Sequence, residues 1–214
     1  MEIKKTDLKQ VITGPISNNV FLIINKETNE SFVTDPSYNA EKIIEMIENS
    51  GTKLKGILLT HGHFDHIMSV DALKDRYEVP VIAGSAEKEL LEEANLNMSC
   101  RMRSNAISLT ADRYVDDGDI IELAGKKIKC IFTPGHTKGS VCWYLEEDAM
   151  LLSGDTLFYE SHGRTEFPTG DREQMKHSLL DILFKLPDDT EVFTGHGEST
   201  TIGYEKKHNL LFYE

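Results

Sequence analysis

The chain has 214 residues, of which 39% are hydrophobic, and its formal net charge of −13 at pH 7 makes it strongly acidic. It shows no Lys/Arg cluster suited to phosphate contacts, so we expect no nucleic-acid partner, and no apolar stretch approaches the roughly 18 residues that span a membrane. No linker rich in proline, glycine or serine divides the chain, which predicts a single domain over residues 1–214.

Short apolar runs bounded by turn residues predict alternating strands and helices in the first half of the chain. The expected elements are a hairpin of Val20–Ile24 and Ser31–Thr34, a helix over Ala40–Glu48, a strand at Gly56–Leu59, a helix with Asp65 as its N-cap, a strand at Val79–Ile82 and a helix capped by Ser85. Acidic residues of this last helix, Glu87, Glu89, Glu92 and Glu93, indicate a solvent-exposed helix face.

The second half of the chain consists mainly of predicted strands joined by turns. The expected strands and helix are, in order, Ile120–Leu123, Lys127–Phe132, Ser140–Leu145, Ala149–Leu152, a helix over Arg172–Phe184 and a short strand at Glu191–Phe193. Because strands and helices alternate within each half, the sequence predicts an α/β protein.

The segment Thr60–His66 reads Thr-His-Gly-His-Phe-Asp-His and places three imidazoles and a carboxylate directly after a predicted strand. In an extended segment residues two apart face the same way, so His61 and His63 can hold one ion, and Asp65 falls on that side too. Adjacent residues point differently where a loop enters a helix, so Asp65 and His66 can serve a second ion. Imidazole and carboxylate without thiolate suit zinc, iron or manganese. The alternative is a capped helix flanked by surface histidines.

Three further residues of ligand type stand just beyond predicted strands, each directly after a glycine that permits a sharp turn. They are His136, Asp155 and His196. Taken singly, each histidine would more often be a hydrogen-bonded or surface residue, and the aspartate a turn residue. Their shared position at strand ends indicates instead that they complete the metal site.

Four motifs, His-x-His-x-Asp-His, Pro-Gly-His-Thr, Ser-Gly-Asp-Thr-Leu-Phe and Gly-His-Gly, occur in this order. In order and spacing they resemble the metallo-β-lactamase superfamily, from about Asn18 to the C-terminus. Within it, the chain is most similar to the glyoxalase II-like hydrolases, also called hydroxyacylglutathione hydrolases. The resemblance implies an αββα sandwich with the metal site at one edge of two sheets.

The same resemblance implies a role for each candidate ligand. It implies that the first metal is bound by His61, His63 and His136, the second by Asp65, His66 and His196, and that Asp155 bridges them. Asp35, in Thr34-Asp35-Pro36, resembles the family carboxylate that supports the ligand loop, whereas the alternative is a simple Asp-Pro turn.

The resemblance implies two divalent metal ions, Zn²⁺ above all, with iron or manganese as alternatives. A metal-bound hydroxide would then cleave a thioester, such as S-lactoyl-glutathione or a related low-molecular-weight thiol conjugate. Each cation stabilises hydroxide over water. The leaving thiolate needs little protonation, because the pKa of its thiol is about 8.5. Asp65 and Asp155 would act as metal ligands, since a carboxylate beside a cation is a weak base.

Substrate recognition is indicated by the loop 163–171, which resembles a loop of short glyoxalase II-like proteins. Arg164 lies where relatives carry a basic residue facing the carboxylate of a thiol conjugate, and Arg can bind a carboxylate bidentately. The alternative is a surface pair of Arg164 with Glu166 or Asp171. Tyr159 is expected at the entrance. The longer glyoxalase II enzymes add a C-terminal helical domain that grips glutathione, so without it glutathione recognition is expected to be weaker or differently built.

Other functions fit the same motifs. A persulfide dioxygenase, a mononuclear iron oxidoreductase on the same fold, would need only His61, His136 and Asp155. Another hydrolase of the superfamily and a non-enzymatic metal-binding module are further alternatives.

The cysteine pattern and the N-terminus predict a cytoplasmic protein. The three cysteines are odd in number and lack a Cys-x-x-Cys pair, which fits a reducing compartment. Cys100, Cys130 and Cys142 are expected to be buried as small hydrophobic residues. The first residues lack the apolar core of a signal peptide.

Overall fold

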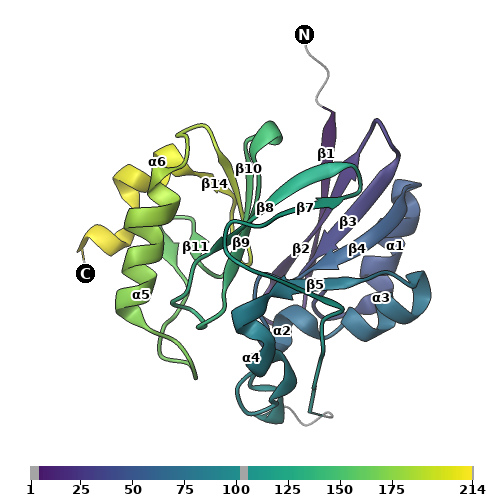
Figure 1. Cartoon of the computed structure of the whole chain (residues 1–214), viewed down its shortest axis with the longest axis horizontal. Helices are drawn as coiled ribbons and strands as arrows, with labels where there is room; N and C mark the ends of the chain where they lie inside the picture. Colours follow the sequence, from purple (N-terminus) through teal and green to yellow (C-terminus); the bar gives the residue numbers. More distant parts are fainter. Residues whose placement is uncertain (1–4, 102–105, 214) are drawn as a thin grey trace.

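Two six-stranded sheets dominate the computed structural model, which describes residues 5–101 and 106–213 (Figure 1). The first sheet follows chain order with β1 (Thr6–Thr13), β2 (Asn18–Asn25), β3 (Glu30–Thr34), β4 (Lys53–Leu58), β5 (Val81–Gly84) and β6 (Arg113–Val115). Its first three strands pair antiparallel, and β3 to β6 pair parallel. The carboxyl ends of β3, β4 and β5 therefore reach the same edge of the sheet.

The second sheet comes from the C-terminal half of the chain. Its spatial order is β14 (Thr200–Thr201), β13 (Glu191–Thr194), β10 (Met150–Gly154), β9 (Val141–Leu145), β8 (Lys126–Phe132) and β7 (Ile120–Leu123). Only β10 and β13 pair parallel among the described strands of this sheet. A short ribbon of β11 (Leu157–Phe158) and β12 (Ser161–His162) follows β10.

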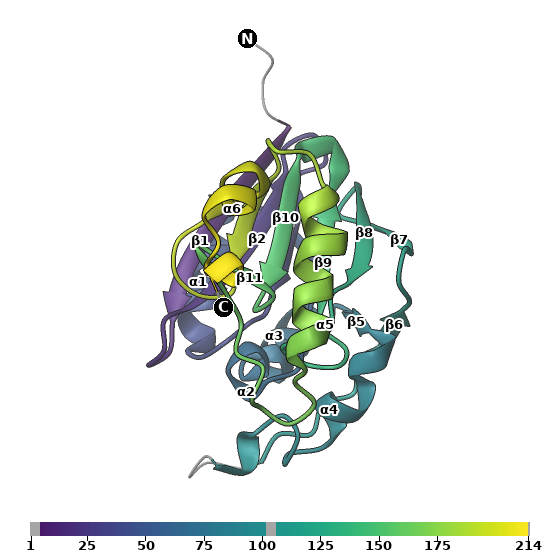
Figure 2. The same cartoon turned by 90° about the vertical axis from the view of Figure 1, so that its left-hand side faces the viewer.

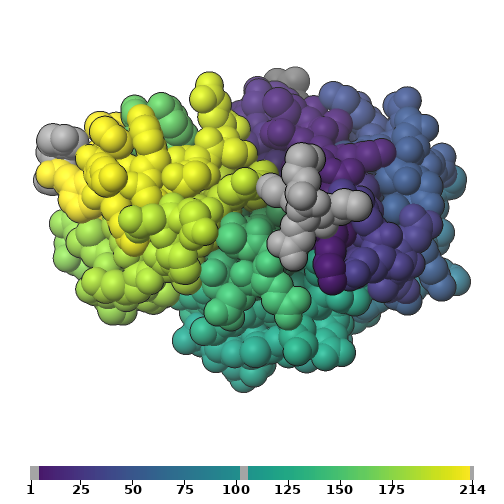
Figure 3. Space-filling model, turned by 90° about the horizontal axis from the view of Figure 1, so that it is seen from above, coloured from purple at the N-terminus to yellow at the C-terminus, as the bar shows by residue number. Residues whose placement is uncertain are grey.

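Helices cover the outer face of each sheet, as Figures 1 and 2 show. The helices are α1 (Ala40–Ser50), α2 (Phe64–Ile67), α3 (Val70–Tyr77), α4 (Lys88–Glu92), α5 (Arg172–His177) and α6 (Ile202–His208). α5 continues through a π turn at Ser178–Ile182 and a 3₁₀ turn at Leu183–Lys185. The N-terminal and C-terminal halves lie side by side when viewed from the end where β1 begins (Figure 3).

Three hydrophobic clusters separate the four layers. The central cluster lies between the sheets and includes Phe32 and Leu58 from the first sheet and Trp143 from the second. One outer cluster packs Ile43 of α1 against the first sheet, and the other packs Leu179 against the second. The αββα sandwich that the motifs imply is confirmed. No helix among residues 5–101 and 106–213 is long and apolar enough to cross a membrane.

The helix predicted after Asp65 is broken, and Asp65 is not its N-cap. His63 occupies the N-cap of α2, and α3 starts only after Ser69. Asp65 lies in the first turn, where its carboxylate accepts a hydrogen bond from the Asn18 side chain at 2.8 Å. A tertiary contact has therefore replaced the local capping bond that the pattern suggested.

Other local predictions also differ from the structure. The pattern does not indicate β1, because this edge strand is polar and most of its side chains are exposed or half-exposed, nor does it indicate β6. Ser85 starts a 3₁₀ turn, and its hydroxyl contacts Asp116 instead of capping α4. Cys130 and Cys142 are buried as predicted, whereas the prediction that Cys100 is buried is wrong, since it is exposed.

Candidate metal centre

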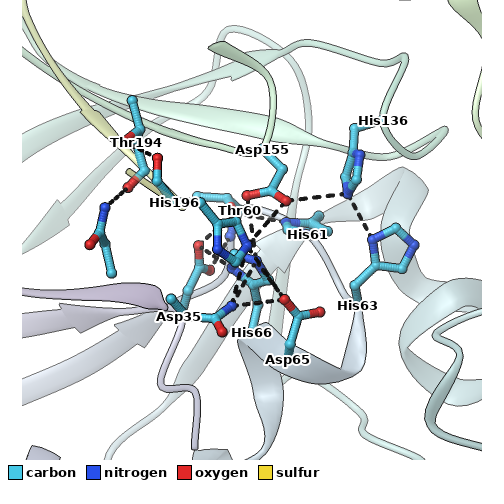
Figure 4. Close-up of polar contacts among 12 residues, drawn as sticks. Asp35, Thr60, His61, His63, Asp65, His66, His136, Asp155, Thr194 and His196 are labelled. Carbon is cyan, nitrogen blue, oxygen red and sulfur yellow. Dashed lines mark hydrogen bonds and ion pairs between the residues drawn. The ribbon is translucent and has the colours of Figure 1, made fainter. Parts of the chain in front are cut away.

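The seven predicted ligands meet at the edge where the strands end, between the two sheets (Figure 4). His61 and His63 follow β4, Asp65 and His66 lie on α2, His136 follows β8, Asp155 follows β10 and His196 follows β13. All are buried except His196, which is half-buried. Segments far apart in the chain thus bring four imidazoles and two carboxylates around one small space with a fifth imidazole at its rim.

The first group consists of His61, His63 and His136, whose ligand atoms lie within 4.8 Å of one another. Nδ1 of His63 is 2.8 Å from Nε2 of His136. Burial and then the neighbouring imidazoles lower the pKa of His61 far below its ordinary value, and burial followed by His136 lowers the pKa of His63 to about 3. These imidazoles are neutral at pH 7, which is the form that binds metal ions.

The second group consists of Asp65, His66 and His196, which also lie within 4.8 Å of one another. Oδ2 of Asp65 is 3.4 Å from Nε2 of His66 and 3.5 Å from Nε2 of His196. Burial alone would lower the pKa of His66, but Asp155, Asp65 and Asp35 outweigh it and raise that pKa to about 10. The negative potential that favours a proton here would equally favour a divalent cation.

Asp155 lies between the two groups. Its Oδ2 is 3.6 Å from Nε2 of His136 in the first group and 3.5 Å from Nε2 of His196 in the second. Its Oδ1 is 3.4 Å from Nε2 of His66. One carboxylate therefore reaches ligands of both groups, which is the position expected of a bridge.

Hydrogen bonds donated by Nδ1 orient several imidazoles with Nε2 towards the centre. Nδ1 of His136 donates to the Arg164 carbonyl at 2.7 Å, and Nδ1 of His196 donates to the Ile16 carbonyl at 3.0 Å. Nδ1 of His66 donates to Asp35 at 3.3 Å. Such bonds fix the ring orientation and the tautomer of a metal-binding histidine.

Asp35 does more than form an Asp-Pro turn. Its Oδ1 accepts the backbone N–H of Thr60 at 2.8 Å, and its Oδ2 accepts the Thr60 hydroxyl at 2.6 Å. The Thr60 oxygen in turn accepts a hydrogen bond from the Nδ1–H group of His61, at 3.1 Å. Asp35 is thus placed to support the loop that carries His61.

Two atoms of the cluster lack a hydrogen-bond partner, and a cation would provide one. Nε2 of His61 and Oδ1 of Asp155 are both buried without such a partner. A buried polar atom left in this state costs about 1–3 kcal/mol. Nitrogen and oxygen donors of this kind suit zinc, iron and manganese. The cluster is therefore compatible with two divalent ions, one at each group.

A family model described as the metallo-beta-lactamase superfamily matches residues 13–196 of the chain. The chain belongs to the metallo-β-lactamase superfamily. Together with this superfamily fold, the His/Asp cluster supports the assignment of the chain as a metal-dependent hydrolase.

Relatives in the metallo-β-lactamase superfamily cover nearly the whole chain. Hydroxyacylglutathione hydrolase GloC from Haemophilus influenzae is 35% identical, over 89% of this chain and 91% of the relative. The crystal structure of the BLEG-1 B3 metallo-β-lactamase is 36% identical with a TM-score of 0.91, covering 97% of this chain and 100% of that one. The crystal structure of TTHA1623 in a di-iron-bound form is 32% identical with a TM-score of 0.83, covering 95% of this chain and 99% of that one.

The two predicted substrate residues lie differently relative to the cluster. The Arg164 guanidinium lies 4.6 Å from the ring centroid of Phe167, and that ring packs against His63 and His136. Tyr159 instead stacks on Tyr204, with the two hydroxyls 3.0 Å apart. The structure thus brings Arg164 to the edge of the cluster and places Tyr159 against α6.

Two polar residues that contact the site are not identified as site residues by sequence reasoning. The Asn18 amide, fully buried, donates to Asp65 and lies 3.4 Å from Nε2 of both His66 and His196. Glu87 is only 1% exposed, so its assignment to an exposed helix face is wrong. Its carboxylate accepts the backbone N–H of Gly62. A single sequence gives no signal for either residue, because their partners lie 25 or more positions away.

Removal of bound metal should destabilise the fold measurably. An ion present at 100 times its dissociation constant stabilises the native state by about 2.7 kcal/mol. For a chain of this size, that corresponds to about 5–10 °C in Tm. We expect a strong chelator to lower Tm by this amount, measured by calorimetry, and to have little effect on a His61→Ala, His66→Ala double variant. An unchanged Tm in the parent protein would contradict metal binding at the cluster.

Proposed function

We propose that this chain is a dinuclear zinc hydrolase that cleaves a thioester of a low-molecular-weight thiol, such as S-lactoyl-glutathione. The observation that carries the proposal is the pair of ligand groups joined by Asp155. The similarity to a relative named hydroxyacylglutathione hydrolase supports the substrate class. The predominance of imidazole among the donors suits zinc.

Two cations at this site would supply an activated water near pH 7 and polarise the substrate carbonyl. The protein would hold them through the first group, the second group and Asp155. Burial alone would raise the pKa of Asp65, but His66, and then bonds from His196 and Asn18, keep it well below its ordinary value. Asp65 is therefore a poor general base and suits the role of a ligand. A thiolate leaves without prior protonation, so no separate general acid is required.

In this proposal Arg164 binds a carboxylate of the substrate. Its side chain is 69% exposed, with Nε 3.3 Å from the Glu166 carboxylate. An exposed ion pair of this type contributes little and can exchange partners. An incoming carboxylate could therefore replace Glu166 while the guanidinium remains stacked on Phe167.

Replacing Arg164 should affect charged substrates selectively. We expect Arg164→Ala to raise KM about 10-fold for a thioester that carries a carboxylate, in keeping with the loss of one charge-assisted hydrogen bond. KM for a neutral thioester should change less than about 2-fold. Arg76→Ala, which removes an exposed arginine on α3 paired with Glu48, is the control. Equal changes for both substrates would dismiss the recognition role.

β-Lactam hydrolysis is a second candidate, favoured by the similarity to the BLEG-1 B3 metallo-β-lactamase. β-Lactam hydrolysis differs from thioester hydrolysis in its leaving group, since an amine must be protonated as the C–N bond breaks. Steady-state kinetics on S-lactoyl-glutathione, simpler acyl thioesters and a chromogenic cephalosporin separate the two candidates. We expect kcat/KM for the best thioester to exceed that for the β-lactam by at least about 100-fold. The reverse order would replace the proposed thioester substrate by a β-lactam.

A further inference from the structure

Glu87 lies between two loops that carry the first ligand group. The first ligand loop, residues 61–63, follows β4, and the second ligand loop, residues 135–139, follows β8. Glu87 ends the 3₁₀ turn before α4 and is 1% exposed. It belongs to neither loop and is not one of the predicted metal ligands.

The Glu87 carboxylate binds both loops at once. Oε1 accepts the backbone N–H of Gly62 at 2.8 Å, and Oε2 accepts the hydroxyl of Thr137 at 3.0 Å. Gly62 stands between His61 and His63, and Thr137 directly follows His136. Each of these two bonds therefore holds a residue adjacent to a first-group histidine.

The backbone around this carboxylate is closely packed. A Cβ at Gly139 would overlap the Glu87 carboxylate and backbone, and a Cβ at Gly62 would come within 2.8 Å of Leu90 and Leu91. Glycine at both positions lets the two loops approach the turn that carries Glu87. Side-chain bulk would separate the loops from the carboxylate.

A buried carboxylate without a cation partner is an unusual way to stabilise a core. Among the described residues the nearby cation, Lys138, pairs with Glu89 and not with Glu87, and burial outweighs its influence and raises the pKa of Glu87 to about 7. Burying such a group costs free energy that hydrogen bonds only partly offset. An apolar residue would fill the same space at lower cost, but it would not join the two loops.

We propose that Glu87 is a positioning residue for the first metal ion: its carboxylate holds the two ligand loops at the separation at which His61, His63 and His136 bind one cation. The inference rests on the proposed metal centre and adds a residue that touches neither metal nor substrate. Partners that orient metal ligands typically change metal affinity by 10–100-fold when they are mutated. The second group has no hydrogen bond to Glu87, so its ion should be retained.

The test counts zinc ions per chain during titration with a chelator, using Glu87→Ala, Glu87→Gln and a control. Glu205→Gln is matched, because Glu205 is also fully buried and accepts bonds from Glu160, Thr200 and Asn209, away from the ligand loops. We expect Glu87→Ala to lose one of two ions at a chelator concentration about 10–100-fold lower than the parent. Glu87→Gln, which keeps an acceptor for Gly62, should be intermediate, and Glu205→Gln should match the parent.

The same titration in a His136→Ala background shows which of the two ions is bound more weakly. There the first group is already incomplete, so Glu87→Ala should make no further difference. If the parent binds two ions and Glu87→Ala binds both as tightly, the positioning role is wrong while the metal centre stands. If the parent binds no ion, the metal centre itself fails. Equal weakening in Glu205→Gln and Glu87→Gln would reduce Glu87 to a general stabilising role.

Discussion

Asp155→Ala is expected to abolish hydrolysis and to release metal from the protein. Asp155 lies within 3.6 Å of imidazoles from both groups, so in the proposed centre its loss would remove a negative ligand from each ion. Charge stabilisation by a bound metal contributes several kcal/mol to the reaction. We therefore expect kcat to fall by at least about 10³-fold. Zinc content after dialysis should drop below that of the parent protein.

The control for this variant is Asp171→Ala. Asp171 is the N-cap of α5 and accepts the backbone N–H of Gln174, so its removal should cost about 1 kcal/mol of stability. It should leave the metal content unchanged. An Asp155→Ala protein that kept two ions and the full rate would rule out Asp155 as the bridge between two metals.

Trp143→Ala is expected to cause a large loss of stability. Trp143 is fully buried in the cluster between the sheets, and its indole N–H donates to the Leu59 carbonyl at 3.1 Å. Truncation leaves a large cavity and an unpaired carbonyl, so the free energy of unfolding should fall by about 3–5 kcal/mol. Urea denaturation of the metal-free protein gives this value directly.

The comparison variant is Trp143→Phe, which keeps most of the ring volume but loses the hydrogen bond. It should cost less than Trp143→Ala, with about 1 kcal/mol attributable to that bond. Because Leu59 directly precedes Thr60 and the first ligand loop, both variants should also weaken zinc binding. A Trp143→Ala protein as stable as the parent would show that the sheets do not depend on this contact.

The clustering of the candidate ligands could be predicted from the sequence because each stands in a short segment whose geometry is local. His61 and His63 are two residues apart after a buried strand, and His136, Asp155 and His196 each follow a glycine at a strand end. The parallel pairings of β3, β4 and β5, and of β10 with β13, place these ends at one edge. Local pattern and topology agree, so the prediction that the ligands gather required no knowledge of side-chain packing.

The residues that sequence reasoning missed act through distant partners. Glu87 stands in a stretch with the composition of an exposed acidic helix, and the hydrogen bonds from Gly62 and Thr137 that offset part of the cost of its burial come from distant segments. Asp65 matched the pattern of an N-cap because that pattern is local, whereas its actual partner, Asn18, lies 47 positions earlier. β1 has no apolar alternation, since it is an edge strand with most side chains exposed or half-exposed. Such features depend on tertiary contacts that periodicity does not encode.

Metal content of the protein, purified without added metal and measured by elemental analysis, tests the central claim most directly. The two groups joined by Asp155 predict about two ions per chain, mainly zinc. One iron per chain would contradict the dinuclear hydrolase and favour a persulfide dioxygenase that uses only His61, His136 and Asp155. Absence of any bound metal, together with no uptake of added zinc, would contradict the metal centre itself.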